Sequence, residues 1–191
     1  MSPEWKTVNE LRQVIETFSQ PEYVHTILNP LPSYGLLVAL VGLLCCAIFR
    51  TRAGQIACLI LVILTSGSAG LVRYYGEEGY DRVKSMTTRK EEAWLEAHKK
   101  RGESPWFWSF YVTAAFALLA LVFALVFPKI SGPLTSLTLL SGLLSVGVAA
   151  WISHAGGLIR HPEFYQGPPP EAESATPLAP STPEGQPSSP P

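Results

Sequence analysis

The chain is poor in cysteine and has no excess of charge of either sign, and each shortage excludes a class of protein. Its 14 Lys and Arg residues balance 15 Asp and Glu residues, so no strongly basic surface favours nucleic acid. Its three cysteines, Cys45, Cys46 and Cys58, lack zinc-site spacing, and a disulfide between the neighbouring pair would be strained. We expect all three to be small packing residues. The sequence contains neither a nucleophile–base spacing nor a phosphate-binding loop that would indicate an enzyme.

Charge is missing altogether from four long apolar stretches, and this absence decides the fold class. Residues 33–49, 55–72, 106–127 and 134–153 contain no Asp, Glu, Lys or Arg. A helix needs about 20 apolar residues to cross the hydrocarbon core of a bilayer. The pattern therefore predicts an all-α fold, a four-helix transmembrane bundle, within a domain of residues 26–165. These stretches hold no histidine either, which disfavours a proton- or sodium-coupled transporter.

The segment before the first span has two patterns. Within the N-terminal segment of residues 1–25, Ser2–Ser19 place apolar side chains at helical spacing, which predicts an amphipathic helix stopped by Gln20-Pro21. We expect this helix to lie in the headgroup plane; docking on the bundle or on a partner is the alternative. The paired prolines of Asn29–Pro32 then predict an extended, rigid lead-in to the first span.

Two polar regions lie beyond the second and fourth spans. Residues 73–105 predict a long polar loop, in which Thr88 and Glu91 form the capping box of a short helix that continues to Arg101. Residues 166–191, rich in Pro and Ser, predict a disordered tail. No internal repeat is apparent along the chain.

Two cues to membrane orientation disagree. Four spans place both termini and the 73–105 loop on one side, and the two short hairpin turns on the other. Only Arg50, Arg52 and Lys129 of the 14 basic residues lie in those turns, which favours cytoplasmic termini. Local density favours termini outside the cytoplasm, because Arg50 and Arg52 directly flank two spans, and this is the orientation we expect. Aromatic residues form a belt at the boundary on the loop side: Tyr34, Tyr74, Tyr75, Trp106, Trp108, Tyr111 and Trp151.

Small residues predict where the spans pack. From the middle of the fourth span onward, every fourth residue is small: Ser141, Ser145, Ala149, Ser153 and Gly157. Helices associate in lipid through close backbone approach, so this stripe is expected to form an interior seam or, alternatively, a homodimer contact. On the seam hypothesis, Gly157→Leu would clash with a neighbouring helix. The adjacent Gly156-Gly157 is expected to let the chain leave helical geometry.

Histidines offer the main candidate for chemistry. All four of them, His25, His98, His154 and His161, map to the membrane side that carries the termini. Neutral imidazole commonly binds transition metals and haem iron, and Glu77 could add an oxygen ligand. Two interpretations stay open: interfacial histidines satisfied by backbone or headgroups, and a metal or haem site.

Four short segments match a recurring set of motifs. They are Tyr23–Pro32 before the first span, Tyr75–Tyr80 after the second, His98 before the third, and Gly156–His161 at the end of the fourth. The set resembles an uncharacterised bacterial family of four-span integral membrane proteins, with its Asn-His-Phe-Pro lead-in, Thr-Gly-Glu turn, His-Glu pair and terminal Gly-Gly-x-x-x-His. The resemblance covers about residues 23–165. It implies the fold and a multi-pass location in the bacterial inner (plasma) membrane, but no established activity.

The resemblance also selects the candidate metal ligands. His25, Glu77, His98 and His161 occupy the matching positions. Pro30 stands where the family has a second histidine, and Lys99 stands where it has Glu, so two further ligands are missing.

Two functions follow as hypotheses. The first is a non-enzymatic accessory or binding subunit that engages a partner at one membrane face. The alternative is a redox or metal-binding membrane protein that uses the histidines of that face, with haem or a transition metal as cofactor. The expected partners are the lipid bilayer and either another membrane protein or a second copy of the chain, and no nucleic acid.

Overall fold

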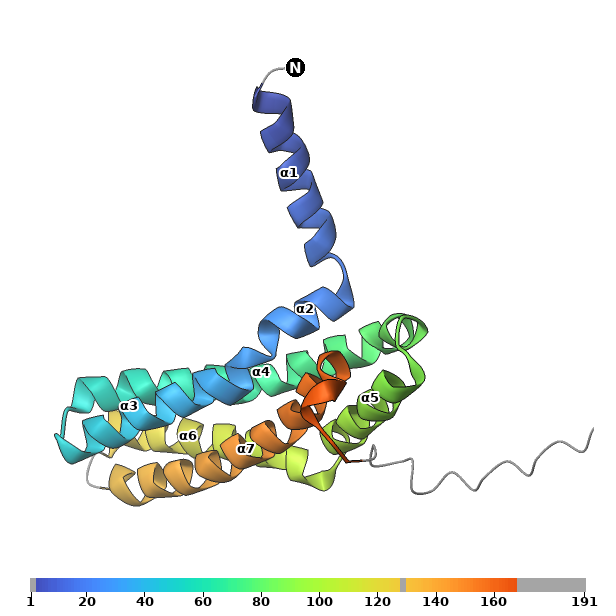
Figure 1. Ribbon diagram of the computed structural model, residues 1–191. Coiled ribbons are helices and arrows are strands. Elements are labelled where there is room, and N and C mark those ends of the chain that lie inside the picture. The colour runs from blue at the N-terminus through green and yellow to red at the C-terminus, as the bar shows by residue number, and fades with distance from the viewer. Residues whose placement is uncertain (1–2, 128–129, 168–191) are drawn as a thin grey trace, which may run out of the picture.

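The structure, a computed structural model, describes residues 3–127 and 130–167, with side chains from residue 9 onward. The described residues form helices and no strands, in the order α1 (Pro3–Phe18), α2 (Pro21–Leu28), the π-helical turn η1 (Leu31–Gly35), α3 (Leu36–Ile48), α4 (Arg52–Ser85), α5 (Arg89–Gly102), the 3-10 turn η2 (Pro105–Trp108), α6 (Ser109–Val126), α7 (Ser131–Arg160) and the 3-10 turn η3 (Pro162–Phe164). The predicted all-α bundle is confirmed (Figure 1). The tail predicted to be disordered lies outside the described residues from residue 168 onward.

Four helical segments are long and apolar enough to cross a membrane: Pro21–Ile48, Arg52–Ser85, Pro105–Val126 and Ser131–Arg160. They run side by side as an elongated bundle, with both hairpin turns at one end and α5 at the other (Figure 1). At a rise of about 1.5 Å per residue, α4 is roughly 50 Å long, whereas a bilayer core is about 30 Å thick. Its last turns therefore extend beyond the hydrocarbon.

The prediction of a long loop over residues 73–105 is wrong. Helix α4 continues without a break to Ser85, and only Met86–Thr88 separate it from α5. The residues there are polar because the last turns of α4 and the helix α5 face water. A polar sequence indicates exposure to solvent and does not distinguish a loop from a helix. The capping box was predicted correctly: the Thr88 side chain accepts a hydrogen bond from the Glu91 backbone, and Glu91 accepts one from the Thr88 backbone at 2.6 Å.

The region before the first span also differs in part from expectation. The predicted amphipathic helix that ends before Gln20-Pro21 is confirmed, because α1 ends at Phe18. What the sequence did not predict is a second short helix, α2, which begins at Pro21 and packs against α4. Pro21 takes the first helical position, where a missing N–H costs nothing. The extended lead-in at Asn29–Pro32 is absent as well, since Pro30 is helical at φ −64° and the π-helical turn η1 follows it. A widened turn relieves the clash between a proline ring and the preceding turn.

The predicted seam on α7 is only partly correct. Ser145 and Ala149 are buried, but Gly157 is exposed and an added Cβ there would meet nothing within 4 Å. Four residues turn a helix by about 400°, which is about 40° more than a full turn. Over the four steps from Ser141 to Gly157 the stripe therefore rotates by roughly 160° away from its starting face. The clash expected for Gly157→Leu is therefore wrong. Gly156-Gly157 also stays within α7, which ends only at Arg160.

Close approaches and one buried hydrogen bond hold the bundle together. A Cβ added at Gly142 of α7 would lie 2.6 Å from Leu40 of α3, and one added at Gly42 would lie 3.0 Å from Cys58 of α4. Thr113 of α6 and Ser145 of α7 share a buried hydrogen bond of 2.9 Å. Small side chains thus let these helices approach as packing in lipid requires.

The bundle consists of two halves with the same order of elements. Helix α2 precedes the spans of α3 and α4, and α5 precedes those of α6 and α7. In each half the short helix packs against the second span, α2 on α4 and α5 on α7. His25 and His98 each lie seven residues before a proline at the start of a span, Pro32 or Pro105. The repeat lies in the order and packing of the helices. It is not apparent in the sequence, because few residues are identical between the two halves.

Candidate functional site

The structure brings two of the candidate ligands together. His25 of α2 and His98 of α5 lie with ring centroids 6.1 Å apart and ring planes at 85°. We call them the histidine pair. Their helices are the short first elements of the two halves, so the pair lies where the halves meet.

Each ring of the histidine pair is fixed by a backbone carbonyl of a span. Nδ1 of His25 lies 2.8 Å from the Val72 oxygen of α4, and Nδ1 of His98 lies 3.0 Å from the Ile152 oxygen of α7. A carbonyl oxygen can only accept, so Nδ1 carries the proton in both rings. In the neutral ring, Nε2 then keeps its lone pair and can bind a metal ion or accept a hydrogen bond.

A glycine exposes each of these carbonyls. Gly76 follows Val72 by four residues, and a Cβ there would lie 2.8 Å from Nδ1 of His25. Gly156 follows Ile152 by four residues, and a Cβ there would lie 3.1 Å from Nδ1 of His98. Helical side chains tilt toward the N-terminus and cover the preceding turn. Glycine at the fourth position therefore leaves the carbonyl open to a donor from a neighbouring helix, and both halves use this arrangement.

Burial sets the charge state of His98. Burial lowers the pKa of His98 below its ordinary value of 6.5, while the hydrogen bond to the Ile152 carbonyl opposes the shift. Electrostatic interactions with His25 and with the Arg101 guanidinium lower that pKa further. His98 is thus neutral at physiological pH, as a metal ligand or a hydrogen-bond acceptor must be.

The other two candidate ligands lie on exposed surfaces with partners of their own. The Glu77 carboxylate pairs with Arg73 at 2.8 Å. His161 pairs with Glu163 at 3.1 Å and stacks on the Phe164 ring. Within residues 3–127 and 130–167, no three His, Cys, Asp or Glu side chains lie close enough together to hold a metal ion. The structure therefore unites His25 and His98 and leaves Glu77 and His161 apart in separate ion pairs.

A polar network beside the pair holds α5 against the end of α4. The Tyr80 hydroxyl donates to Glu96, and Lys84 bridges Glu96 and Glu92 at 3.2 and 3.1 Å. The hydrogen bond from Tyr80, followed by those from Lys84, lowers the pKa of Glu96. Lys99 lies 4.1 Å from the centroid of the Tyr80 ring. This network positions the helix that carries His98.

Sequence reasoning missed the elements that build the pair. It identified His25 and His98, but not the carbonyls of Val72 and Ile152, which any residue could supply. The detectable signal was the spacing of Gly76 and Gly156, which lie at equivalent positions of the two halves.

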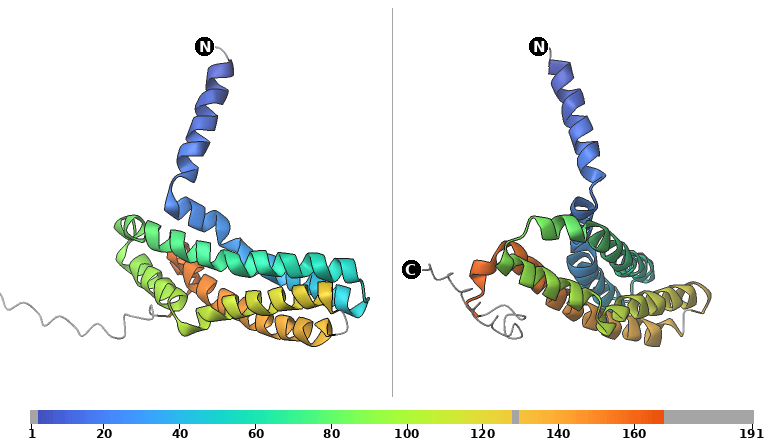
Figure 2. Two further views of the ribbon diagram at one scale, coloured as in Figure 1. Left: turned by 180° about the vertical axis from the view of Figure 1, so that it is seen from behind. Right: turned by 90° about the vertical axis from the view of Figure 1, so that its right-hand side faces the viewer.

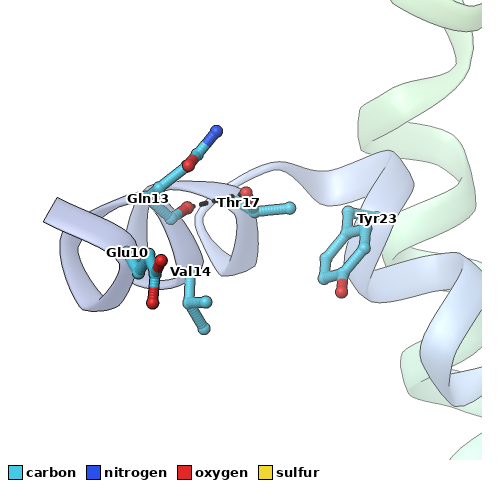
Figure 3. Close-up of a pocket in the computed structure, with 5 residues that line it drawn as sticks. All are labelled: Glu10, Gln13, Val14, Thr17 and Tyr23. Atoms are coloured by element: carbon cyan, nitrogen blue, oxygen red, sulfur yellow. Dashed lines mark hydrogen bonds between the residues drawn. The ribbon is translucent and has the colours of Figure 1, made fainter. Parts of the chain in front are cut away.

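A second concave surface lies in the angle between α1 and α2. It is lined by Glu10, Gln13, Val14, Thr17 and Tyr23, and Figure 3 shows it open on one side. Thr17 donates to the Gln13 carbonyl at 2.7 Å, so its hydroxyl is already used within α1. This surface offers no convergent set of polar groups.

Comparisons with known proteins add no identity to this geometry. No family model matches the chain, and neither the curated proteins nor the solved structures give a match.

Proposed function

We propose that the protein is a non-enzymatic integral membrane protein, an accessory or binding subunit that engages a partner at the membrane face where α1, α2 and α5 lie. The observation that carries this proposal is the direction of α1. It points away from the bundle, across the direction of the spans, in every view (Figures 1 and 2). A helix that runs across the direction of the spans can lie along the membrane surface.

The side chains of α1 suit that plane. Leu11, Ile15 and Phe18 form one apolar side and are exposed by 58%, 69% and 52%. The opposite side carries polar residues: Glu10, Arg12, Gln13 and Glu16. An amphipathic helix of this kind rests its apolar side in the headgroup layer and turns its polar side to water. A partner at the membrane surface would meet that polar side.

The location and orientation belong to the same proposal. The resemblance to a bacterial family supports the inner membrane, and Arg50 and Arg52 in the tight α3–α4 turn support a cytoplasmic position for that turn. Both termini then lie outside the cytoplasm. Labelling a cysteine introduced in the tail with a membrane-impermeant reagent in intact cells tests this orientation, and labelling only after lysis would reverse it.

Accessibility measurements test the placement of α1. Spin labels at residues 13 and 15 would be introduced into a full-length chain whose three cysteines are replaced by Ala, in lipid nanodiscs. We expect the label at 15 to be relaxed more by oxygen, which concentrates in lipid, and the label at 13 more by a water-soluble nickel chelate. Equal exposure of both labels to nickel would contradict an interfacial helix.

Photocrosslinking tests the partner. A crosslinker at Gln13, on the polar side, should give one protein adduct of defined mass in native membranes. The adduct should disappear in Ile15→Asp, which removes α1 from the headgroup layer, while the amount of protein in the membrane is unchanged. Lipid adducts alone from position 13, or a protein adduct indifferent to Ile15→Asp, would refute binding through α1.

The histidine pair favours a second candidate function, the binding of a transition-metal ion or haem. Two imidazoles with Nδ1 held by carbonyls and Nε2 unprotonated match the way that proteins orient metal-bound histidines. Such a site would supply two nitrogen ligands, and water or a partner would complete the coordination.

Elemental analysis and an optical spectrum of the purified protein test this candidate. Bound metal, or a Soret band for haem, should be lost in His25→Ala and in His98→Ala. It should be kept in the control His161→Ala, because that histidine lies in a separate ion pair. Protein without metal after purification and after titration with Cu(I), Zn²⁺ and haem would refute it.

A further inference from the structure

An open apolar groove runs along the outside of α7. It is lined by Trp106, Leu140, Leu143, Leu144, Gly147 and Trp151. Gly147 leaves the floor of the groove empty, since an added Cβ would meet nothing within 4 Å. The leucines are exposed by 51% to 67%, so the groove faces the surrounding lipid rather than the interior of the bundle.

The groove has the length and position of one lipid chain. From Trp151 to Leu140 is eleven residues of helix, or roughly 16 Å at 1.5 Å per residue. That is about half of a hydrocarbon core about 30 Å thick, and so the depth of one leaflet. The tryptophans lie at one end of the groove, where their amphipathic rings suit the headgroup boundary.

A guanidinium group lies at that same end. Arg101, in the last turn of α5, is 5.1 Å from the Trp151 ring and donates to the Trp151 carbonyl at 2.6 Å. Its other recorded neighbour is Nδ1 of His154, at 3.5 Å. Among the described residues no carboxylate forms an ion pair with Arg101, whereas Arg12, Arg73, Arg82 and Lys84 each pair with one. Lys99 and Lys100 add positive charge to the same turn.

We infer that this groove is a binding site for one anionic phospholipid. One acyl chain lies over Gly147 between the leucines, and the phosphate accepts hydrogen bonds from the guanidinium N–H groups of Arg101 that Trp151 and His154 leave available. Charge complementarity selects a phospholipid as the occupant, because an apolar groove that ends beside a guanidinium group matches an acyl chain that ends at a phosphate.

Native mass spectrometry tests the site on the full-length protein in mild detergent with equal amounts of phosphatidylglycerol and phosphatidylcholine. We expect one tightly retained lipid and a preference for phosphatidylglycerol of about fivefold, the effect of one basic residue at a membrane surface. Arg101→Gln should reduce the preference to near one without removing the retained lipid.

Two glycine variants test the acyl-chain part of the site. Gly147→Leu fills the groove and should abolish the tightly retained lipid. Gly67→Leu is the matched control, because a Cβ at Gly67 on the exposed surface of α4 also meets nothing within 4 Å. It should retain lipid like the unaltered chain.

Three results would overturn the inference. They are equal retention of the two lipids by the unaltered chain, a preference that survives Arg101→Gln, and lipid retention that survives Gly147→Leu. A dimer that Gly147→Leu dissociates and Gly67→Leu does not would assign the groove to a second copy instead.

Discussion

Glycine at two positions determines where the histidines bind. Gly76 and Gly156 lie inside continuous helices, where glycine costs about 1 kcal/mol relative to alanine, and each lies against an imidazole. The hydrogen bond that each glycine admits, together with the packing of the ring, offsets that cost. Exposed glycines on the same helices, such as Gly67 and Gly157, serve as internal comparisons, because a Cβ added at either would meet nothing within 4 Å.

Gly76→Ala should destabilise the protein. The new methyl group would lie 2.8 Å from Nδ1 of His25 and push the ring away from the Val72 carbonyl. We expect a net loss of about 1–2 kcal/mol, because overpacking and the lost hydrogen bond exceed the gain in helix propensity. Thermal unfolding in detergent measures it. Gly67→Ala and Gly157→Leu should leave the melting temperature unchanged or raise it, and a fall in both to match Gly76→Ala would contradict this account.

Acid should weaken the fold through His98. Because burial lowers its pKa in the folded state, the unfolded chain binds the proton more readily than the folded one. The free energy of unfolding is therefore not reduced by His98 above the pKa of 6.5 in the unfolded chain, and it declines as the pH falls below that value. Melting temperatures recorded from pH 7.5 to 5.5 should show this decline. His98→Gln, which keeps a hydrogen-bond donor but cannot titrate, should flatten the profile, and an unchanged slope would exclude His98 as the cause.

Helices α4 and α5 show how far elements can be read from the sequence. The apolar part of α4 was predicted because uncharged runs of this length have one stable form in lipid. Its extension to Ser85 was missed, since polar residues are compatible with loops and with solvated helices alike. The start of α5 was predicted within two residues, because a capping box is a local interaction that needs no tertiary context.

Thr88→Ala should loosen α5. It removes the side-chain oxygen that accepts from the Glu91 backbone, a loss of about 1 kcal/mol for a helix cap. Because α5 carries His98, hydrogen exchange of its amides should accelerate more than that of α7. Thr51→Ala is a suitable control, since Thr51 precedes α4 without making a capping hydrogen bond. Equal effects of the two substitutions would argue against the capping role.

The two halves of the molecule pack along α4 with α6 and α3 with α7, and the histidine pair adds a further meeting point between them. Local patterns predicted the spans and named both histidines, but which residues meet depends on how the halves associate, and periodicity carries no such information. The same limit explains the seam on α7. The stripe of small residues was real, yet helix rotation, fixed by the neighbours, decided which of its members are buried.

A double-mutant cycle measures the coupling of the halves. His25→Ala and His98→Ala should each cost about 1–2 kcal/mol, because each leaves a buried or half-buried carbonyl without its second donor. Since the rings lie in contact, the double variant should deviate from additivity by at least about 0.5 kcal/mol. His161→Ala, on an exposed surface, should cost nothing measurable. Strict additivity of the first two would show that the pair does not couple the halves.

The hairpin end of the bundle leaves one compartment with very little to recognise. Only Phe49–Thr51 separate α3 from α4, and the connection from Val126 to Ser131 is nearly as short, whereas α1, α2, α5 and η3 gather at the opposite end (Figure 1). Within residues 3–127 and 130–167, an antibody, protease or soluble ligand that approaches from the hairpin side finds the turn at Phe49–Thr51 and the ends of α3, α4, α6 and α7, and no additional helix. Among the described residues, α1, α5 and η3 all offer their water-facing surfaces at the opposite end, so a soluble partner of these helices would have to approach from that end.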